Sequence, residues 1–160
     1  MNRKYNIDYF KEKINKIREI RKDISITTDV IVGFPNETDE DFNETVKNIK
    51  EINFSKIHVF PYSRRKNTKA DLMDNQIDDV VKKKRVKVLL DLSKELEIDY
   101  FSKFIGKKVI FIPEVIKDNY LIGHTGNYLL VKSKGNKEDL NKEIEVEIKD
   151  VNYPYVIGKL

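Results

Sequence analysis

Apolar residues recur every three or four positions through the first part of the chain, which is the spacing of a helix face. A first amphipathic helix is predicted over about residues 7–22, and a second is predicted to begin after Thr38. Three acids follow Thr38, which suits a capped helix N-terminus with its positive dipole. A long third helix is predicted over about residues 75–104. Its inward positions are expected to be Ile77, Val81, Val88, Leu92 and Leu96.

Two short segments rich in β-branched residues, 25–32 and 56–60, predict buried strands. They begin about 30 residues apart with a helix between them, which is the length of one βαβ unit with a parallel strand pair and a right-handed crossover. Parallel sheets are normally covered on both faces and have more strands. We therefore expect this part to be a piece of a larger sheet, or to pair with another chain.

After Gly106 the helical spacing gives way to short alternating segments, so we place a domain boundary there, with domains over residues 1–106 and 107–160. Ile144, Val146 and Ile148 alternate with charged residues, as in a strand with one wet face. Five such segments predict a small antiparallel β-barrel. They read VIFIPEVI, YLIGHT, NYLLVK, EIEVEI and YVIGKL.

Composition narrows the possible chemistry. The 160 residues include 31 Lys and Arg, 27 Asp and Glu, two His and no Cys, with a net charge of +4. The lack of Cys excludes disulfides, cysteine nucleophiles and any iron–sulfur cluster held by thiolates of this chain. The mild positive charge permits a nucleic-acid partner without requiring one. With no apolar run near 18 residues and no apolar signal core, we expect a cytoplasmic protein with no membrane partner.

The loop after the first strand, GFPNET, begins with Gly33. A glycine at a strand end lets a ligand approach the backbone, and the next helix offers free N–H groups for an anion or carboxylate. The alternative is that Gly33 and Pro35 only shape a turn. Asp29, an acid within the first strand, is expected to be buried, and it either has a function or accepts a hydrogen bond from a neighbouring hydroxyl.

Basic residues cluster after the second strand and on the long helix. Tyr62 could stack on a base, and Arg64, Arg65 and Lys66 could contact phosphates, or the segment could be an exposed basic loop. The run Lys82–Arg85 is expected to be a solvated helix face.

The C-terminal part has its own candidate RNA residues, which surround the turn at 124–126. Aromatic and basic residues on a small barrel can hold RNA. Residues 107–160 contain nine basic and eight acidic residues, so the overall charge favours RNA only weakly. The candidates are Tyr120, His124, Asn127, Tyr128 and Lys132, with His124 expected to serve the turn rather than catalysis.

Taken together, these stretches resemble a known family. TTDVIVGFPNETDEDF, FSKIHVFPYSRRKNTKA and VKKKRVKVLLDLSKEL resemble, in this order, the second half of the radical S-adenosylmethionine methylthiotransferases of tRNA. The ending GHTGNYLLVK with VIGKL is similar to the TRAM RNA-binding domain of these enzymes. The resemblance implies an α/β fold, in which a partial β/α (TIM-like) barrel is followed by a small OB-like TRAM barrel. The chain would then begin inside the β/α barrel and lack the N-terminal half of the enzyme.

The segment SKIHVFPYS is most similar to the branch that acts on threonylcarbamoyladenosine, and the isopentenyladenosine branch is the alternative. The implied reaction adds a methylthio group at carbon 2 of the modified adenosine next to the anticodon of tRNA. S-adenosylmethionine and two four-iron four-sulfur clusters serve this reaction in the full enzyme. Because this chain cannot ligate either cluster, we expect it to be inactive alone.

The resemblance also implies roles for particular residues. Asn36 departs from the glycine that the family usually has, which puts a backbone contact there in doubt. Arg3 lies in a stretch that faces the active site in the family. The S-adenosylmethionine candidates are Asp29, Ile31, Gly33, Pro61, Tyr62 and Ser63. The tRNA or substrate candidates are Arg3, Arg64, Arg65, Tyr120, His124, Asn127, Tyr128 and Lys132.

Two other readings remain open from the sequence. One is a stand-alone, cysteine-free RNA-binding module in which the α/β part is a scaffold. The other is an interaction domain whose exposed strand edges recruit a partner chain.

Overall fold

The computed structural model describes residues 4–160, so the expectation for Arg3 lies outside the described residues. The chain forms two compact units, one ending at Leu96 and the other covering Glu97–Leu160. This division falls before Gly106, where the sequence pattern changes. It does so because the end of the long helix packs into the core of the second unit.

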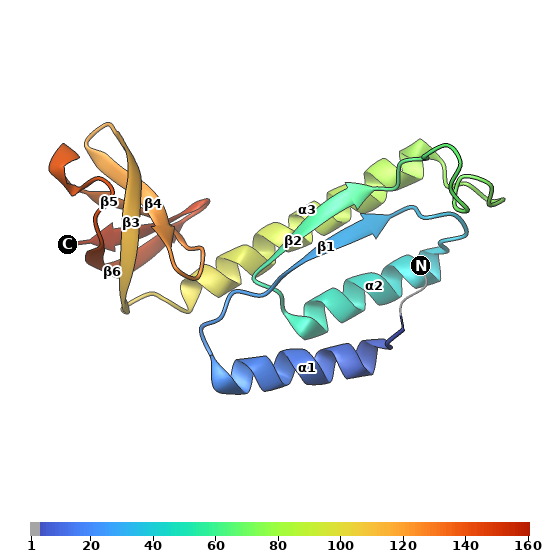
Figure 1. The fold of residues 1–160 in the computed structure, drawn as a ribbon, viewed down its shortest axis with the longest axis horizontal. Helices are drawn as coiled ribbons and strands as arrows, with labels where there is room; N and C mark the ends of the chain where they lie inside the picture. The colour runs from blue at the N-terminus through green and yellow to red at the C-terminus, as the bar shows by residue number, and fades with distance from the viewer. Residues whose placement is uncertain (1–3) are drawn as a thin grey trace. The chain divides into compact units, whose positions relative to one another are not determined.

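The first unit contains helices and one two-stranded sheet (Figure 1). Its elements are α1 (Ile7–Ile20), β1 (Thr27–Val32), α2 (Asp39–Ile52), β2 (Lys56–Pro61) and most of α3 (Asp79–Ser102). The two strands pair in parallel, with Thr27 opposite Lys56 and Val32 opposite Pro61. The predicted βαβ arrangement is therefore confirmed, whereas a closed β/α barrel is not formed by residues 4–160.

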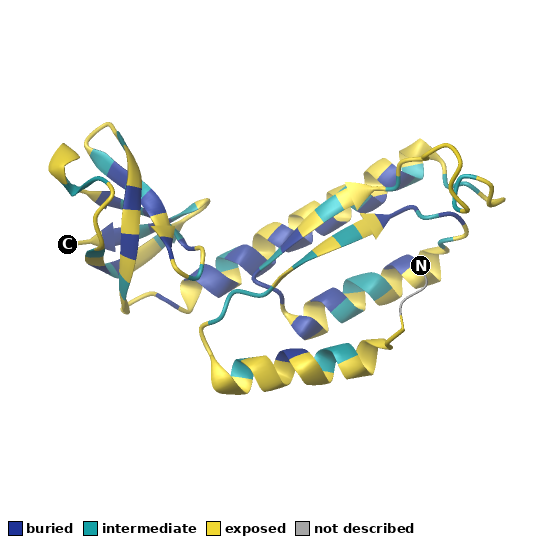
Figure 2. Cartoon of the chain, in the orientation of Figure 1, coloured by how far each residue is buried: buried dark blue, intermediate teal, exposed yellow. Residues whose placement is uncertain are grey.

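The sheet of the first unit is buried on one face and exposed on the other (Figure 2). Val32 and Ile57 are buried in a core that they share with all three helices. On the opposite face Ile31 is 40% exposed and its register partner Phe60 is 50% exposed. Asp29 is exposed on this same face, so the expectation of a buried acid was wrong. Its side chain needs no buried partner, because no described element covers it.

Helix α3 turns Leu92 and Leu96 toward the core, as predicted, but not Val88. Leu89, Leu92 and Leu96 are buried, but Val88 is 41% exposed. The buried row continues toward the N-terminus through Arg85 and Lys82, which are 5% and 8% exposed. The expectation of a solvated face for the whole run Lys82–Arg85 was therefore wrong, because the two long aliphatic stems occupy core positions. No helix among residues 4–160 has the length and apolar character needed to cross a membrane.

The second unit is a closed five-stranded barrel in the order β3-β4-β5-β7-β6. The strands are β3 (Lys108–Lys117), β4 (Tyr120–Thr125), β5 (Leu130–Lys134), β6 (Ile144–Asn152) and β7 (Tyr155–Lys159), with a short 3-10 helix at Lys137–Asp139. This is a small OB-like barrel, as predicted. One detail differs, because β5 and β7 pair in parallel, with Val131 opposite Val156. The barrel is therefore not wholly antiparallel, since β7 lies between β5 and β6.

The barrel core combines strand residues with the end of α3 (Figure 2). Phe111, Leu121 and Ile148 are almost completely buried. Tyr100 and Phe104 join this core with their rings in edge contact, 5.3 Å between centroids. Large aromatic side chains from α3 and the turn after it thus fill space that five short strands would leave.

Candidate functional site

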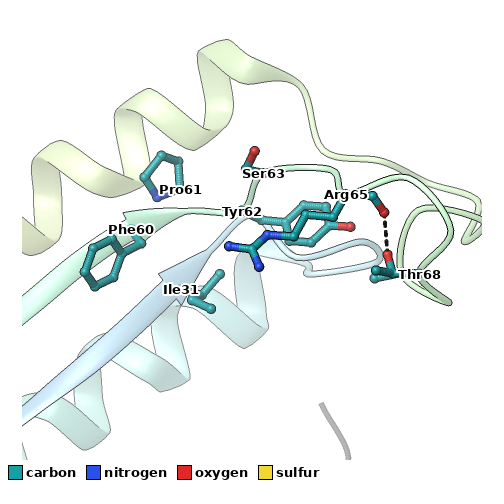
Figure 3. Close-up of a pocket in the computed structure, with 8 residues that line it drawn as sticks. Ile31, Phe60, Pro61, Tyr62, Ser63, Arg65 and Thr68 are labelled. Carbon is teal, nitrogen blue, oxygen red and sulfur yellow. Dashed lines mark hydrogen bonds between the residues drawn. The ribbon is translucent and has the colours of Figure 1, made fainter.

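A pocket of about 550 Å³ lies where β1 and β2 end (Figure 3). The carboxyl ends of parallel strands are the usual ligand edge of α/β proteins. Its lining is mostly apolar and includes five of the predicted site residues. The lining residues are Ile31, Phe60, Pro61, Tyr62, Ser63, Arg65, Thr68 and Ala70. The candidates Asp29, Gly33 and Arg64 lie in the same unit but do not line this pocket.

Tyr62 continues the strand ladder beyond β2. Its backbone N–H donates to the Val32 carbonyl at 2.8 Å. Its ring packs edge-on against Phe34, 5.3 Å between centroids, and the Lys82 ammonium lies 5.8 Å from its centre. The Tyr62 hydroxyl is buried and has no hydrogen-bond partner among the described residues. A buried phenol without a partner is costly, so this hydroxyl is a point of stored instability next to the pocket.

Gly33 is buried at the end of β1 with a φ of +71°. A Cβ at this position would lie 2.4 Å from the Lys82 Cγ, so a side chain cannot be accommodated without a shift. The Gly33 amide donates to the Glu37 carboxylate at 3.0 Å. Glycine is therefore required here by both backbone conformation and close packing.

Glu37 is held in turn by Arg85 of α3. The Arg85 guanidinium donates to Glu37 Oε1 at 2.6 Å and to Asp39 Oδ1 at 2.8 Å. The chain of contacts runs from the long helix through a carboxylate to the Gly33 amide, and it fixes the loop that follows β1. Sequence reasoning missed this role of Arg85. The helical spacing of Lys82, Arg85 and Leu89, in register with the buried leucines, was the signal that could have found it.

The N-terminus of α2 is occupied by the protein's own side chains. Thr38 and Asp41 form a reciprocal capping box, with Thr38 Oγ1 accepting from the Asp41 amide at 3.1 Å. Asp39 and Glu40 add two more carboxylates to the first turn. An anionic ligand would therefore meet like charges, which favours the alternative in which Gly33 and Pro35 only shape a turn.

Asn36 adopts a φ of 67° in the same loop. Asparagine tolerates this left-handed conformation better than most residues other than glycine. Its side-chain carbonyl also accepts from Asn75 Nδ2 at 2.9 Å. The departure from glycine at this position therefore preserves the backbone path.

His58 is a site-facing residue that sequence reasoning passed over. It is exposed on β2 and lies opposite Asp29 in the parallel register, on the same open face as Ile31 and Phe60. Strand alternation placed all four on one face, but only the register shows that the acid and the imidazole are neighbours.

The barrel carries a group of aromatic and basic side chains on the outward side of β4, β5 and β7. The Lys132 ammonium lies 4.5 Å from the centre of the Tyr120 ring and 5.5 Å from that of Tyr155. Lys134 is the register partner of Tyr120. We call these four residues the basic aromatic face. Tyr155 was not among the sequence candidates, because its closeness to Lys132 depends on the parallel β5–β7 pairing.

The remaining barrel candidates have separate surroundings. His124 lies within β4 rather than in a turn, with Nδ1 2.8 Å from Glu114 Oε1. Asn127 accepts from Thr125 Oγ1 at 2.6 Å, which stabilises the β4–β5 loop. Tyr128 in that loop is 76% exposed. Tyr128 is thus available for stacking, whereas Asn127 shapes the turn.

Charges are sorted around the barrel. The described strands β5 and β7 contain three lysines and no carboxylate, and β4 contains neither. Strands β3 and β6 contain all four strand carboxylates, Glu114, Glu145, Glu147 and Asp150, together with Lys108, Lys117 and Lys149. On β6, Glu147 pairs with Lys149 at 2.6 Å, and its pKa is lowered chiefly by that hydrogen bond. Lys108 pairs with Glu145 at 2.8 Å. One side of the barrel is therefore cationic and the other is internally neutralised.

The described residues do not suit an iron–sulfur cluster or a metal ion. The sequence has no cysteine. Within residues 4–160, no three His, Asp or Glu side chains gather in a way that could hold a metal.

Comparisons with known proteins give the class of protein. No protein-family model matches the chain. The threonylcarbamoyladenosine tRNA methylthiotransferase of Bacillus subtilis is 40% identical over 164 residues, which covers 99% of this chain and 36% of the relative. The corresponding enzyme of Thermotoga maritima is 38% identical over 138 residues, or 86% of this chain and 32% of the relative.

A tRNA-2-methylthio-N(6)-dimethylallyladenosine synthase of Endomicrobium trichonymphae is 39% identical over 160 residues, covering 100% of this chain and 38% of the relative. The chain is thus a relative of the tRNA-modifying methylthiotransferases, and the resemblance seen in the sequence is confirmed. The relatives carry two names, one for threonylcarbamoyladenosine and one for dimethylallyladenosine. This chain spans little more than a third of their length, 36% and 38% for the two relatives from Bacillus and Endomicrobium.

Proposed function

We propose that the chain is part of a tRNA methylthiotransferase that adds a methylthio group at carbon 2 of threonylcarbamoyladenosine next to the anticodon. The observation that carries this proposal is the 40% identity with a threonylcarbamoyladenosine enzyme across both units. The sorted charges of the barrel, with Lys132 between two tyrosine rings, support tRNA as its partner. The alternative substrate is dimethylallyladenosine, since a relative of that name is 39% identical.

The first unit would contribute to a cofactor and substrate pocket. S-adenosylmethionine supplies a methyl group and a radical in this class of chemistry. Ile31, Phe60 and the segment Pro61–Ser63 would hold an adenosyl group, because they offer an apolar and aromatic surface at the strand ends. Gly33 would contribute by fixing the loop that follows β1. Both iron–sulfur clusters would be held by the N-terminal half of the enzyme, which we propose as a partner of this chain, and this chain alone would be inactive.

The barrel would bind tRNA through the basic aromatic face. In OB-type barrels the second and third strands form the usual oligonucleotide surface, and these are β4 and β5 here. Cationic side chains attract phosphates, and the tyrosine rings stack on unpaired bases. A stand-alone RNA-binding module would use the same surface, so substrate identity needs a separate test.

The binding test uses a matched pair of lysine variants. Lys132→Met removes a cation of the basic aromatic face, and Lys149→Met removes one that is paired with Glu147 on β6. We expect Lys132→Met to weaken tRNA binding severalfold and to reduce the slope of log affinity against log salt by about 0.7 to 0.9. Lys149→Met should change neither. Equal effects of the two variants would reject this face as the tRNA surface.

The substrate test measures modified nucleosides in tRNA. A strain that lacks the gene for this chain should lose the 2-methylthio form of threonylcarbamoyladenosine and retain that of dimethylallyladenosine. The reverse pattern would select the alternative substrate. Retention of both would leave the RNA-binding module as the better description.

A further inference from the structure

The neighbours Arg64 and Arg65 have different surroundings, although they are indistinguishable in the sequence. Arg64 is committed to the loop, since its Nε donates to Asp71 Oδ1 at 2.9 Å and its Nη2 donates to the Asp71 carbonyl at 2.9 Å. The Asp71 side chain is only 18% exposed, so this pair braces the loop between β2 and α3. Arg64 is therefore occupied by a structural contact.

Arg65 lines the pocket and is exposed, and its guanidinium makes no hydrogen bond or ion pair with the described residues. Figure 3 shows its side chain extending from the loop back toward the strand ends. It is the only charged residue among the eight that line the pocket. A guanidinium beside an apolar surface, with no counter-charge from the described residues, is suited to an anionic group of a ligand.

Hydrogen bonds fix the backbone turn that carries Arg65. The Thr68 hydroxyl donates to the Arg65 carbonyl at 2.8 Å, and the Thr68 amide donates to the same carbonyl at 3.3 Å. Asn67 takes the left-handed conformation that this turn needs, with a φ of 67°. The Asp71 amide then donates to Thr68 Oγ1 at 3.2 Å. The turn therefore presents Arg65 from a fixed position.

Tyr62 and two apolar residues belong to the rest of the lining around Arg65. The Tyr62 hydroxyl is buried without a hydrogen-bond partner among residues 4–160. Ile31 and Phe60, both largely exposed, form the apolar part of the lining. The lining thus combines an apolar and aromatic surface with a single guanidinium.

We propose that this pocket binds an adenosine-type ligand through an anionic oxygen group held by Arg65, and that Arg64 has no part in this contact. The adenosine chemistry rests on the proposed function, whereas the anion contact rests on the pocket itself. Two sources can supply the anionic oxygens: a nucleotide phosphate, or the carboxylate of an amino-acid group attached to adenosine. Both satisfy the planar donors of a guanidinium.

The test compares Arg65→Met with Lys66→Met in the full 160-residue chain. Both variants remove one positive charge from the same loop, but Lys66 does not line the pocket. Calorimetry with two pairs of ligands then distinguishes a phosphate from a carboxylate as the group that Arg65 binds. Adenosine 5′-monophosphate against adenosine tests phosphate, and S-adenosylmethionine against 5′-methylthioadenosine tests carboxylate.

We expect Arg65→Met to weaken at least one anionic probe about tenfold, with little change for its neutral counterpart. Arg65→Lys should recover only part of the loss, because it keeps the charge without the planar fork. If only the affinity for adenosine 5′-monophosphate falls, the group bound by Arg65 is a phosphate. If only the affinity for S-adenosylmethionine falls, that group is a carboxylate. Equal losses in both variants, equal losses for charged and neutral probes, or no binding of either anionic probe at millimolar concentration would overturn the proposal.

The outcome is independent of the tRNA test. If the Lys132 and Lys149 variants bind tRNA equally, the barrel part of the proposed function fails while the Arg65 result stands. If the Arg65 result fails, tRNA binding by the barrel is unaffected.

Discussion

Arg85 Nη1 lies 2.6 Å from Glu37 Oε1, and both side chains are largely buried, with 6% and 16% of their surface exposed. The same carboxylate oxygen accepts the Gly33 amide. A buried ion pair does not by itself stabilise a fold, but removal of one partner leaves an uncompensated charge. The pair therefore makes the conformation of the β1–α2 loop depend on a residue of α3.

Arg85→Met is expected to destabilise the first unit by about 3 kcal/mol, because Glu37 would remain buried without its counter-charge. The measurement is urea unfolding followed by a probe of the first unit. Lys82→Met is the matched control, with the same charge change on the same helix. Its ammonium contacts Asp79, whose side chain is 84% exposed, and Met preserves the packed stem. This control should differ from the parent by less than about 1 kcal/mol.

Equal destabilisation by the two variants would contradict this account. A further check is the variant with both Arg85→Met and Glu37→Gln. It should be less destabilised than the sum of the single changes, because the two residues act on each other.

Gly33→Ala is expected to cost at least about 2 kcal/mol. The change adds left-handed strain for a residue with a Cβ and a collision with the buried stem of Lys82. Gly106→Ala provides the comparison, since Gly106 has a φ of +80° but no atom within 4 Å of its added Cβ. It should show only the strain, about 1 kcal/mol. Equilibrium unfolding of each variant measures the difference, and equal costs would show that the contact with Lys82 yields freely.

Gly123→Ala is expected to disrupt the barrel selectively. The added Cβ would lie 1.9 Å from the Ile112 carbonyl oxygen, so strands β3 and β4 would have to separate. Because the colliding atoms belong to the backbone, no flexible side chain can move away to relieve the overlap. We therefore expect the free energy of unfolding to fall by more than about 3 kcal/mol. Amide hydrogen exchange should speed up in β3 and β4 while β1 and β2 keep their protection. Unchanged exchange in β3 and β4 would show that the strand pair adjusts.

Tyr153 donates a hydrogen bond to Glu97 Oε2 at 3.0 Å, which ties the end of α3 to the turn before β7. Partial burial raises the pKa of Tyr153, and the bond to Glu97 raises it further. The folded state then holds the phenol proton more tightly than the unfolded state. Its stabilising contribution is complete below the unfolded pKa of about 10 and is lost as the pH rises through the folded pKa.

Tyr153→Phe is therefore expected to cost about 1 kcal/mol at neutral pH. The difference from the parent protein should shrink above the folded-state pKa of Tyr153. Urea unfolding of the parent protein and the variant, at neutral pH and again above the folded-state pKa of Tyr153, measures this change. A difference that stays constant with pH would mean that the hydrogen bond does not contribute.

Much of the fold is predictable from local pattern. Alternation in Ile144, Val146 and Ile148 correctly predicts a strand with one buried face, and the capping residues after Thr38 correctly predict the start of α2. The parallel pairing of β5 with β7 is not predictable in this way, because alternation fixes the face of a strand and not its neighbour. On α3, Leu92 and Leu96 were correctly predicted to face inward, but Lys82 and Arg85 were not, because charged residues with long stems were counted as solvated.

Local pattern also predicts part of the candidate site. Residues at strand ends, such as Ile31 and Tyr62, follow from the βαβ pattern. The separation of Arg64 from Arg65 depends on Asp71, which lies several residues away along a loop with no periodic pattern. Tyr155 joins Lys132 only through a long-range strand pair. Contacts of this kind depend on tertiary structure, and residue propensity and periodicity do not predict them.

The uneven distribution of charge around the barrel affects how it orients in an electric field. Residues 107–160 contain nine basic and eight acidic residues, so this region has almost no net charge, while β5 and β7 contain lysines alone and the strand carboxylates all lie on β3 and β6. A nearly neutral body with a dipole experiences a weak pull in the field of a polyanion, but it experiences a substantial torque. If the barrel binds tRNA as proposed, it would rotate as it nears the RNA, so that the Lys132 side faces the phosphates before contact.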